Sequence, residues 1–210
     1  MTLTLDSALA AMPLVAILRG VTPDEVEAIA EAIVVAGIGI IEVPLNSPDP
    51  FTSIRRLART LEGRALVGAG TVLKISDVER VADAGGTVIV SPNTDIEVIR
   101  ASKAQGLLSL PGFFTVSEAF DALEAGADAL KLFPAEMASP AGVKAMRAVF
   151  PKGTRLLAVG GISPQTIPPY LAAGVDGFGV GSDLYAVGRS AKEVGKRAEA
   201  LTAAVRAMRA

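Results

Sequence analysis

A lysine, Lys131, interrupts an otherwise apolar run between Ala127 and Ala135 that reads ADALKLFPA. Lysine is uncommon in strands and is almost never fully buried unless its ammonium group has a partner or a chemical task. Desolvation or a nearby positive charge lowers the pKa of an amine, and the neutral amine can then attack a carbonyl carbon. Lys131 is therefore a candidate for imine formation. The alternative is a lysine whose stem packs at the strand end while its ammonium group reaches water.

Histidine and cysteine are both absent from the 210 residues, which removes the commonest general base, the commonest metal ligand and any thiol nucleophile. Acid–base chemistry then falls to Glu, Asp, Lys, Tyr or water. The net charge is −2 and no basic cluster is interleaved with aromatic residues, so nucleic acid is not an expected partner. No apolar run is long enough to span a bilayer and the first residues lack a basic leader. We expect a soluble, cytoplasmic protein that binds no membrane.

The chain is divided by glycines that follow helix-like patterns and precede apolar runs. A glycine just past a helix end supplies the left-handed residue that terminates the helix, and these positions are Gly37, Gly85, Gly106, Gly126 and Gly174. The apolar runs predict strands at 14–20, 39–45, 65–71, 87–92, 107–112, 128–134, 155–160 and 177–181. Amphipathic stretches lie between them and are preceded by cap-like residues, for example Thr22, Ser76, Thr94, Ser117 and Ser163.

Strands that alternate with helices in this way predict an α/β protein with a parallel sheet. Eight such units in so short a chain favour a closed (β/α)8 (TIM) barrel over an open, doubly wound sheet. No linker or shift in composition marks a second domain, so residues 1–210 are expected to form one barrel domain. Residues 1–13 are expected to form an arm or short helix over the amino-terminal end of the barrel.

Polar residues occur at the predicted strand ends, where barrels of this kind assemble their active sites. Glu42 lies among apolar neighbours on the second strand and is a candidate general base, or else a carboxylate that faces solvent. Arg19, after the first strand, has the planar donor geometry that suits a carboxylate, but it could also pair within a loop. Thr71, after the third strand, is a candidate ligand of substrate or a cap for the next segment.

Two glycine loops follow the seventh and eighth predicted strands. The first contains Gly160 and Gly161, and the second contains Gly181 and Ser182. These two loops commonly form a phosphate cradle in (β/α)8 barrels, and a short helix starting near Ser182 would suit an anion. Glycines also serve tight turns, which is the alternative for each pair.

Six motifs, in order between Pro13 and Tyr185, resemble those of the class I aldolases that act on 2-keto-3-deoxy-6-phospho sugar acids. They begin at Glu42 (EVPLNSP), Gly68 (GAGTVL), Ser91 (SPN), Leu130 (LKLFPA), Val159 (VGG) and Gly181 (GSDLY). The resemblance implies a (β/α)8 fold, usually a homotrimer, with no metal or organic cofactor. The implied ligand is a small phosphorylated sugar acid.

Within that family the chain is more similar to the 6-phosphogalactonate branch than to the 6-phosphogluconate branch. Asn46 stands where many gluconate-type members have arginine, and Val159 stands where they commonly have threonine. The first difference leaves Arg19 as the main cation for a pyruvyl carboxylate. The alternative is the gluconate-type activity, with or without activity on 4-hydroxy-2-oxoglutarate. The preferred epimer at C4 remains open, because the side chains that discriminate epimers differ by only a hydrogen bond or a methyl group.

The residues support a retro-aldol hypothesis. Lys131 forms an imine at the C2 ketone, and Glu42 acts as general base and acid, directly or through one water. Arg19 and Thr71 orient the carboxylate. The backbone N–H groups of the two glycine loops, at Gly160 and Gly161 and at Gly181 and Ser182, hold the phosphate. The products would be pyruvate and glyceraldehyde 3-phosphate.

Three questions remain open in the sequence. Phe133 either packs beside the imine or belongs to the core. An isomerase or epimerase could use Glu42 for proton abstraction and Lys131 only to polarise a carbonyl. A sugar-phosphate sensor without catalysis would bind ligand and show no turnover.

Overall fold

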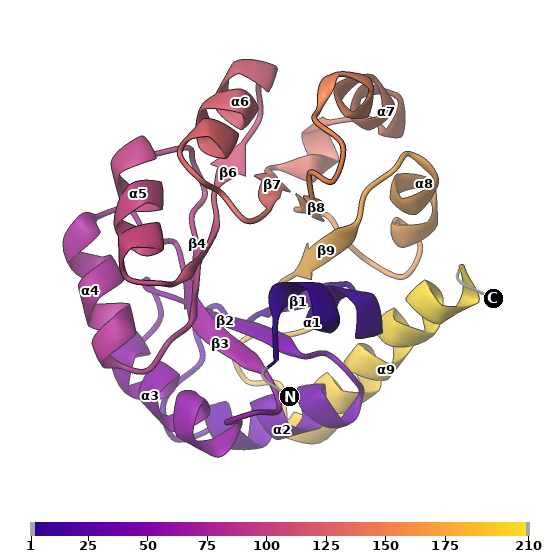
Figure 1. The fold of residues 1–210 in the computed structure, drawn as a ribbon. Coiled ribbons are helices and arrows are strands. Elements are labelled where there is room, and N and C mark those ends of the chain that lie inside the picture. Colours follow the sequence, from indigo (N-terminus) through magenta and orange to yellow (C-terminus); the bar gives the residue numbers. More distant parts are fainter. Residues whose placement is uncertain (1–2, 209–210) are drawn as a thin grey trace.

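Helices and strands alternate along residues 3–208, the part of the chain described by this computed structural model (Figure 1). The strands are β1 (Leu14–Ile17), β2 (Ile40–Pro44), β3 (Leu66–Gly70), β4 (Val88–Val90), β5 (Leu108–Leu110), β6 (Gly112–Phe113), β7 (Leu130–Leu132), β8 (Leu156–Val159) and β9 (Gly177–Val180). The helices are α1 (Leu5–Ala11), α2 (Val26–Val35), α3 (Pro50–Thr60), α4 (Ile75–Asp83), α5 (Ile96–Ala104), α6 (Val116–Glu124), α7 (Pro140–Val149), α8 (Ile167–Ala172) and α9 (Ala191–Ala207), with a 3-10 turn, η1 (Ala135–Met137).

The strands form one parallel sheet in the order β5-β4-β3-β2-β1-β9-β8-β7-β6. β5 pairs with β4 and β6 pairs with β7, and only Pro111 separates β5 from β6. The two segments are therefore halves of one barrel strand, and the predicted (β/α)8 barrel is confirmed. The predicted strand at 107–112 was wrong in being continuous: proline has no N–H to donate, and the chain changes its pairing partner there.

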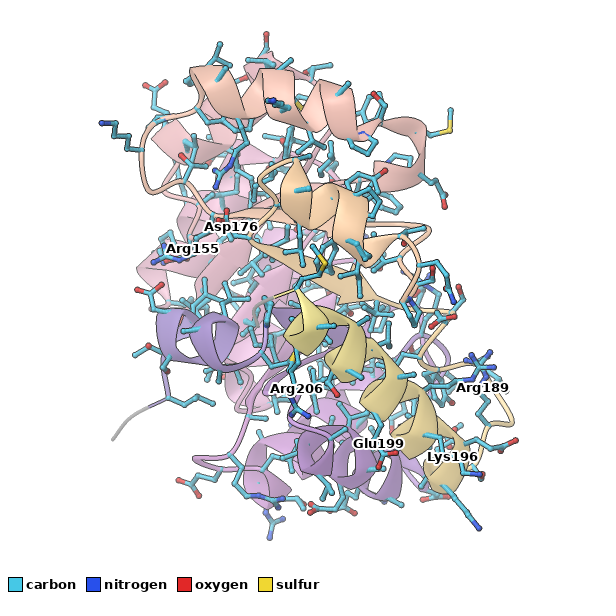
Figure 2. The ribbon with its side chains drawn as sticks, turned by 90° about the vertical axis from the view of Figure 1, so that its right-hand side faces the viewer. Arg155, Asp176, Arg189, Lys196, Glu199 and Arg206 are labelled. Atoms are coloured by element: carbon cyan, nitrogen blue, oxygen red, sulfur yellow. The ribbon has the colours of Figure 1, made fainter. Side chains whose placement is uncertain are left out.

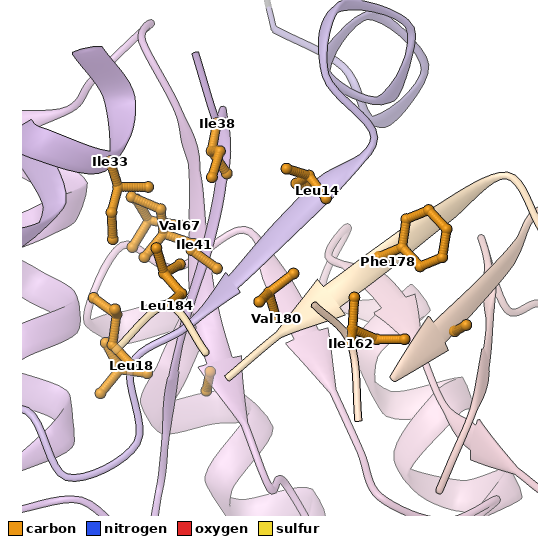
Figure 3. Packing of buried hydrophobic residues seen from close by; sticks show 14 of the residues in the cluster. Leu14, Leu18, Ile33, Ile38, Ile41, Val67, Ile162, Phe178, Val180 and Leu184 are labelled. Carbon is orange, nitrogen blue, oxygen red and sulfur yellow. The ribbon is translucent and has the colours of Figure 1, made fainter. Parts of the chain in front are cut away.

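Two apolar layers hold the barrel together. Alternate residues of each strand point into the barrel or out toward the helices, as Val15 and Leu14 do on β1. The outer layer packs strand residues such as Leu14, Ile41 and Phe178 against the ring of helices, and Figure 3 shows Ile33 of α2 near Ile41 of β2. The inner layer fills the barrel and includes α1, which lies across one end of it (Figure 1).

The predicted helix ends are confirmed, but several predicted helix starts were wrong. All five predicted terminating glycines have positive φ, between 72° at Gly106 and 103° at Gly37. At the starts, the capping residues are Lys74, Asp95, Thr115 and Thr166 where Ser76, Thr94, Ser117 and Ser163 were expected, and α2 follows Glu25, three residues after Thr22. Thr115 forms a reciprocal capping box with Glu118, so the backbone geometry selected a threonine two residues before the expected serine.

Within residues 3–208 no helix is both long and apolar enough to cross a membrane. The cytoplasmic location stays a prediction. So does the extent of the domain over 1–210, since residues 1–2 and 209–210 lie outside the described part of the chain.

Candidate active site

All the residues selected from the sequence line one pocket of about 160 Å³ at the carboxyl ends of the strands. They are Arg19, Glu42, Thr71, Lys131, Gly160, Gly161, Gly181 and Ser182. The pocket is also lined by Pro92 and Gly179, and by two apolar residues that the sequence did not single out, Ile17 and Ile162.

Glu42 and Lys131 reach this pocket because both occupy inward positions of their strands. Glu42 is in register with Ile17 on β1, and Lys131 is in register with Leu157 on β8. Both side chains are buried, with exposed fractions of 2% and 6%. On the side away from the pocket they lie over the apolar lining of the barrel, which includes Val90. The fold therefore removes water from both groups and leaves their polar ends at the pocket.

Burial shifts the pKa of the two groups toward each other. It raises the pKa of Glu42 from 4.5 to about 7, against the opposing charges of Lys131 and Arg19. It lowers the pKa of Lys131, a shift that Glu42 opposes and Arg19 reinforces. Among the described residues, Glu42 Oε2 has no hydrogen-bond partner. A carboxyl that exchanges its proton near neutrality and an amine that loses its proton more readily than usual thus share one site.

Gly70, at the end of β3, provides the space for the Glu42 carboxyl group. A Cβ atom built on Gly70 would lie 1.8 Å from Oε2 of Glu42, far inside the contact distance. Any side chain at this position would therefore displace the carboxyl group. Gly70 belongs to the GAGTVL motif, but nothing in the sequence alone indicates this role.

Arg19 and Thr71 stand at the mouth of the pocket. Arg19 Nη1 donates to Oδ1 of Asn46 at 2.6 Å. Thr71 has φ of 58°, a left-handed conformation that is costly for a β-branched residue and that clusters at functional sites. Thr71 does not cap the next helix, because α4 begins after Lys74. The capping alternative for Thr71 was therefore wrong.

The two glycine loops, which follow β8 and β9, also line the pocket, and β9 is the neighbour of β1 in the barrel. Gly160 and Gly161 both have positive φ, 110° and 66°. After β9, the N–H groups of Leu184 and Tyr185 both donate to the carbonyl of Gly181 at 2.9 Å. This is a single turn, so the short helix expected near Ser182 was wrong.

The turn does not continue as a helix. The next backbone hydrogen bond runs from the N–H of Arg189 to the carbonyl of Ala186 and closes a separate turn. The side chain of Arg189 braces the first turn from outside by donating to the carbonyl of Ser182 at 2.7 Å. Figure 2 shows Arg189 at the opposite end of the molecule from Arg155 and Asp176. No feature of the sequence pattern had indicated this contact.

Phe133 lies beside the lysine and not in the core. Its ring centroid is 4.9 Å from Nζ of Lys131, and the side chain is 37% exposed. An aromatic face at this distance attracts a cation and excludes water from one side of it. Of the two possibilities for Phe133, the structure supports the position next to the amine.

A larger hollow of about 710 Å³ lies at the other end of the strands, near the start of β3. Its charged lining residues are exposed and of both signs, for example Arg55, Arg59, Glu62 and Asp83. It holds no buried nucleophile or buried carboxyl group. Within the described residues there is also no group of three or more His, Cys, Asp or Glu side chains placed to hold a metal ion. The smaller pocket, with the buried Glu42 and Lys131, is therefore the candidate active site.

A parallel (β/α)8 barrel with an ionisable, water-depleted pocket at its carboxyl end is a barrel enzyme. Comparison with known proteins identifies which one: residues 5–201 match the family model described as KDPG and KHG aldolase, and the chain belongs to that family of lyases.

Two curated relatives are similar over most of the chain. One is 47% identical over 192 residues, 91% of each chain, and is named probable 2-dehydro-3-deoxy-6-phosphogalactonate aldolase of Rhizobium meliloti (strain 1021). The other is 45% identical over 195 residues, 93% of this chain and 95% of its own, and is the 2-dehydro-3-deoxy-6-phosphogalactonate aldolase of Escherichia coli (strain K12). A solved structure described as native KDPGal has a TM-score of 0.94 at 42% identity and covers 99% of this chain and 98% of its own.

Proposed function

We propose that this protein is a Schiff-base aldolase that cleaves 2-dehydro-3-deoxy-6-phosphogalactonate to pyruvate and D-glyceraldehyde 3-phosphate. The observation that carries the proposal is the burial of Lys131 and Glu42 in one pocket. Both curated relatives described above bear the name of this activity.

The reaction begins at Lys131. Its neutral amine attacks the C2 carbonyl carbon to give a carbinolamine. The protonated Glu42 carboxyl then donates its proton to the carbinolamine hydroxyl, which leaves as water, so a protonated imine and the Glu42 carboxylate remain. The lowered pKa of Lys131 increases the fraction of neutral amine. The cationic imine nitrogen then accepts the electron pair of the C3–C4 bond. The ring of Phe133 lies close enough to Lys131 Nζ to stabilise that cation.

Glu42 provides the proton transfers. Its carboxylate takes the proton of the C4 hydroxyl as the C3–C4 bond breaks, so the aldehyde leaves and an enamine remains on Lys131. The proton is then returned to C3, and water hydrolyses the imine to release pyruvate. A carboxyl group with a pKa of about 7 suits both directions of transfer.

The two ends of the substrate are held by different groups of the pocket. Arg19 and Thr71 bind the carboxylate next to C2, and the backbone N–H groups of the two glycine loops bind the phosphate. The glycine positions are Gly160, Gly161 and Gly181, followed by Ser182. Binding at both ends orients C4 against Glu42, which lowers the entropic cost of the reaction.

Reduction with borohydride in the presence of pyruvate tests the mechanism. We expect one covalent adduct, on Lys131, identified by peptide mass spectrometry. The Lys131→Met variant should form no adduct and lose at least about 10³-fold in kcat, since it lacks the nucleophile. Full activity of that variant would sink the imine mechanism, and an isomerase would show neither adduct nor cleavage.

A second candidate is the gluconate-type activity, because the matching family model names KDPG and KHG aldolases together. The two substrates differ in configuration at C4, so kcat/KM measured on both epimers separates them. We expect a preference for the galactonate epimer. A strong preference for the gluconate epimer would overturn the assignment of substrate but not the chemistry at Lys131.

We also propose that the protein is a homotrimer, as the family resemblance implies. Supporting this is a set of exposed apolar side chains on neighbouring elements, which we call the α6–α7 surface: Phe114, Val116, Phe120, Met137 and Val149. Large apolar side chains exposed on successive elements favour an association site over a solvent-facing surface.

A further inference from the structure

We infer that Asn46 is a positioning residue: its amide oxygen aligns the guanidinium group of Arg19 for the substrate carboxylate without neutralising it. The inference deepens the proposed function, because it rests on Arg19 binding that carboxylate. Asn46 was noticed in the sequence only as a departure from the gluconate-type pattern, with no role assigned to it.

The loop that follows β2 holds the loop that follows β1 at two points. Asn46 Oδ1 accepts a hydrogen bond of 2.6 Å from Nη1 of Arg19. The buried Ser47 accepts one of 2.9 Å at its hydroxyl from the N–H of Gly20. The loop itself is fixed by the bond from the N–H of Ser47 to the carbonyl of Pro44, the last residue of β2. The side chain and the backbone of the Arg19 loop are thus both held from β2.

The same strand carries Glu42, four residues before Asn46. A further bond, from the N–H of Leu18 to the carbonyl of Glu42, joins the two strand ends at 3.0 Å. One short segment, from Glu42 to Ser47, therefore sets both the general base and the cation that binds the carboxylate. The distance between the Glu42 carboxyl group and the Arg19 guanidinium group is therefore set by one tight turn and not by two independent loops.

An amide suits this task better than a carboxylate would. The amide oxygen accepts an N–H of the guanidinium group and carries no formal charge, so the positive charge of Arg19 stays available. Arg19 forms no ion pair with a carboxylate of residues 3–208. One of its five N–H donors is used by Asn46, and the guanidinium fork still has donors for a substrate carboxylate.

Pyruvate alone tests the inference, because it carries the carboxylate and the ketone but no phosphate. The measured quantity is the pyruvate concentration that gives half-maximal borohydride trapping on Lys131. Asn46→Ala removes the acceptor and should raise that concentration about five- to tenfold, as expected for the loss of one hydrogen bond between exposed side chains. Thr60→Ala is the matched control: it breaks a side-chain bond between α3 and Glu27 of α2 on the outer wall, and should leave trapping unchanged.

Asn46→Asp separates alignment from charge. It keeps an acceptor oxygen for Arg19 but adds a negative charge that neutralises Arg19 and repels pyruvate. At low salt it should raise the half-maximal pyruvate concentration more than Asn46→Ala does. At about 1 M salt, where such charges are screened within a few ångströms, it should recover toward wild type while Asn46→Ala does not. Equal, salt-independent effects of the two variants would overturn the inference.

A crystal structure of the ligand-free Asn46→Ala variant gives a second readout that does not depend on activity. We expect the guanidinium group of Arg19 to leave its position while Glu42 and Ser47 stay in place. Arg19 unmoved in that variant would overturn the inference and leave the proposed function intact. If borohydride traps no pyruvate on Lys131 of the wild-type protein, the proposed function is overturned, whatever the position of Arg19.

Discussion

At the scale of single residues, the proposed chemistry depends on Glu42 and Lys131, two ionisable groups that are both buried. Glu42 lies in a space kept open by Gly70, and its Oε2 atom has no partner among the described residues. An unpaired buried carboxyl group is costly, and such costs are tolerated where function requires them. Burial likewise removes water from the ammonium group of Lys131, which also costs free energy of folding. The pair is thus destabilising for the fold and useful for proton transfer.

Glu42→Gln should reveal that cost as a change in the pH dependence of stability. The pKa of Glu42 is about 7 in the folded protein and 4.5 as the ordinary value, so between these pH values the folded state holds a proton that the unfolded chain has lost. The wild-type free energy of unfolding therefore falls as pH rises, by about 1.4 kcal/mol per pH unit from this group. The variant lacks this loss. The difference in the free energy of unfolding between the variant and wild type should therefore shift by about 1–3 kcal/mol in favour of the variant as the pH rises from about 5 to about 8.

Urea denaturation at a series of pH values measures this difference. Because Lys131 titrates in the same pocket, the comparison is repeated in a Lys131→Met background, which isolates the contribution of Glu42. A difference between Glu42→Gln and its parent that stays flat across the pH range in both backgrounds would contradict the raised pKa.

The residues that the sequence could predict are those whose chemistry is out of place locally. Lys131 and Glu42 are charged groups in apolar strands, and that mismatch is visible without a structure. Asn46 and Gly70 are not out of place in a turn or a strand end. Their roles depend on what the neighbouring strand places opposite them, which is a long-range property. Arg189 depends likewise on how the chain turns after β9.

At the scale of elements, the loops after β8 and β9 should control the phosphate end alone. Gly161 has φ of 66°, and a Cβ atom there would lie 2.8 Å from Oε2 of Glu136. Gly161→Ala should therefore shift the loop and raise KM for the phosphorylated substrate about tenfold, at a cost of one to two kcal/mol in interaction energy. Trapping by pyruvate should not change, because pyruvate has no phosphate.

Gly153→Ala is the matched control for this variant. Gly153 also has positive φ, 86°, and a Cβ atom there would meet nothing within 4 Å. It lies in the turn before β8, so it reports the backbone strain without the effect on the loop. Steady-state kinetics with the phosphorylated substrate compares the two variants. The assignment fails if Gly161→Ala weakens pyruvate trapping as much as it raises KM.

The order of elements was predictable because glycine ends five of the helices in the same way and an apolar run follows each of them. Strand lengths were not, since every predicted strand was longer than the paired segment. β4 is paired only from Val88 to Val90, against the predicted 87–92. Pairing ends where the neighbouring strands diverge at the barrel rim, and a strand's own residues carry little information about its neighbours. The interruption at Pro111 was unpredictable for the same reason. A proline in the sequence indicates where strand pairing stops, but not that the chain pairs with another strand directly after it.

At the scale of the whole molecule, the barrel has two unlike ends. At the amino-terminal end, Leu5, Ala8 and Leu9 of α1 pack into the inner apolar layer, and Asp6 pairs with Arg155. The opposite end holds the pocket. Glu42 and Lys131 therefore have packed apolar residues on one side and the candidate active-site pocket on the other. This asymmetry explains how a polar reaction is supported by a barrel whose interior is otherwise apolar.

The outer surface of the barrel also has a region that exposes large apolar side chains, the α6–α7 surface, and we expect the subunits to associate there. On the α6–α7 surface, Phe120 is 42% exposed and stacks edge-on against the buried Phe150, with ring centroids 6.1 Å apart. Phe120→Glu would place a charge on this surface, and burying it in an interface would cost several kcal/mol. We expect the variant to sediment as a monomer while wild type sediments as a trimer. Val35→Glu, at a 74% exposed position on α2, should remain trimeric. A wild-type monomer would contradict the trimer, and a trimeric Phe120→Glu variant would show that another surface forms it.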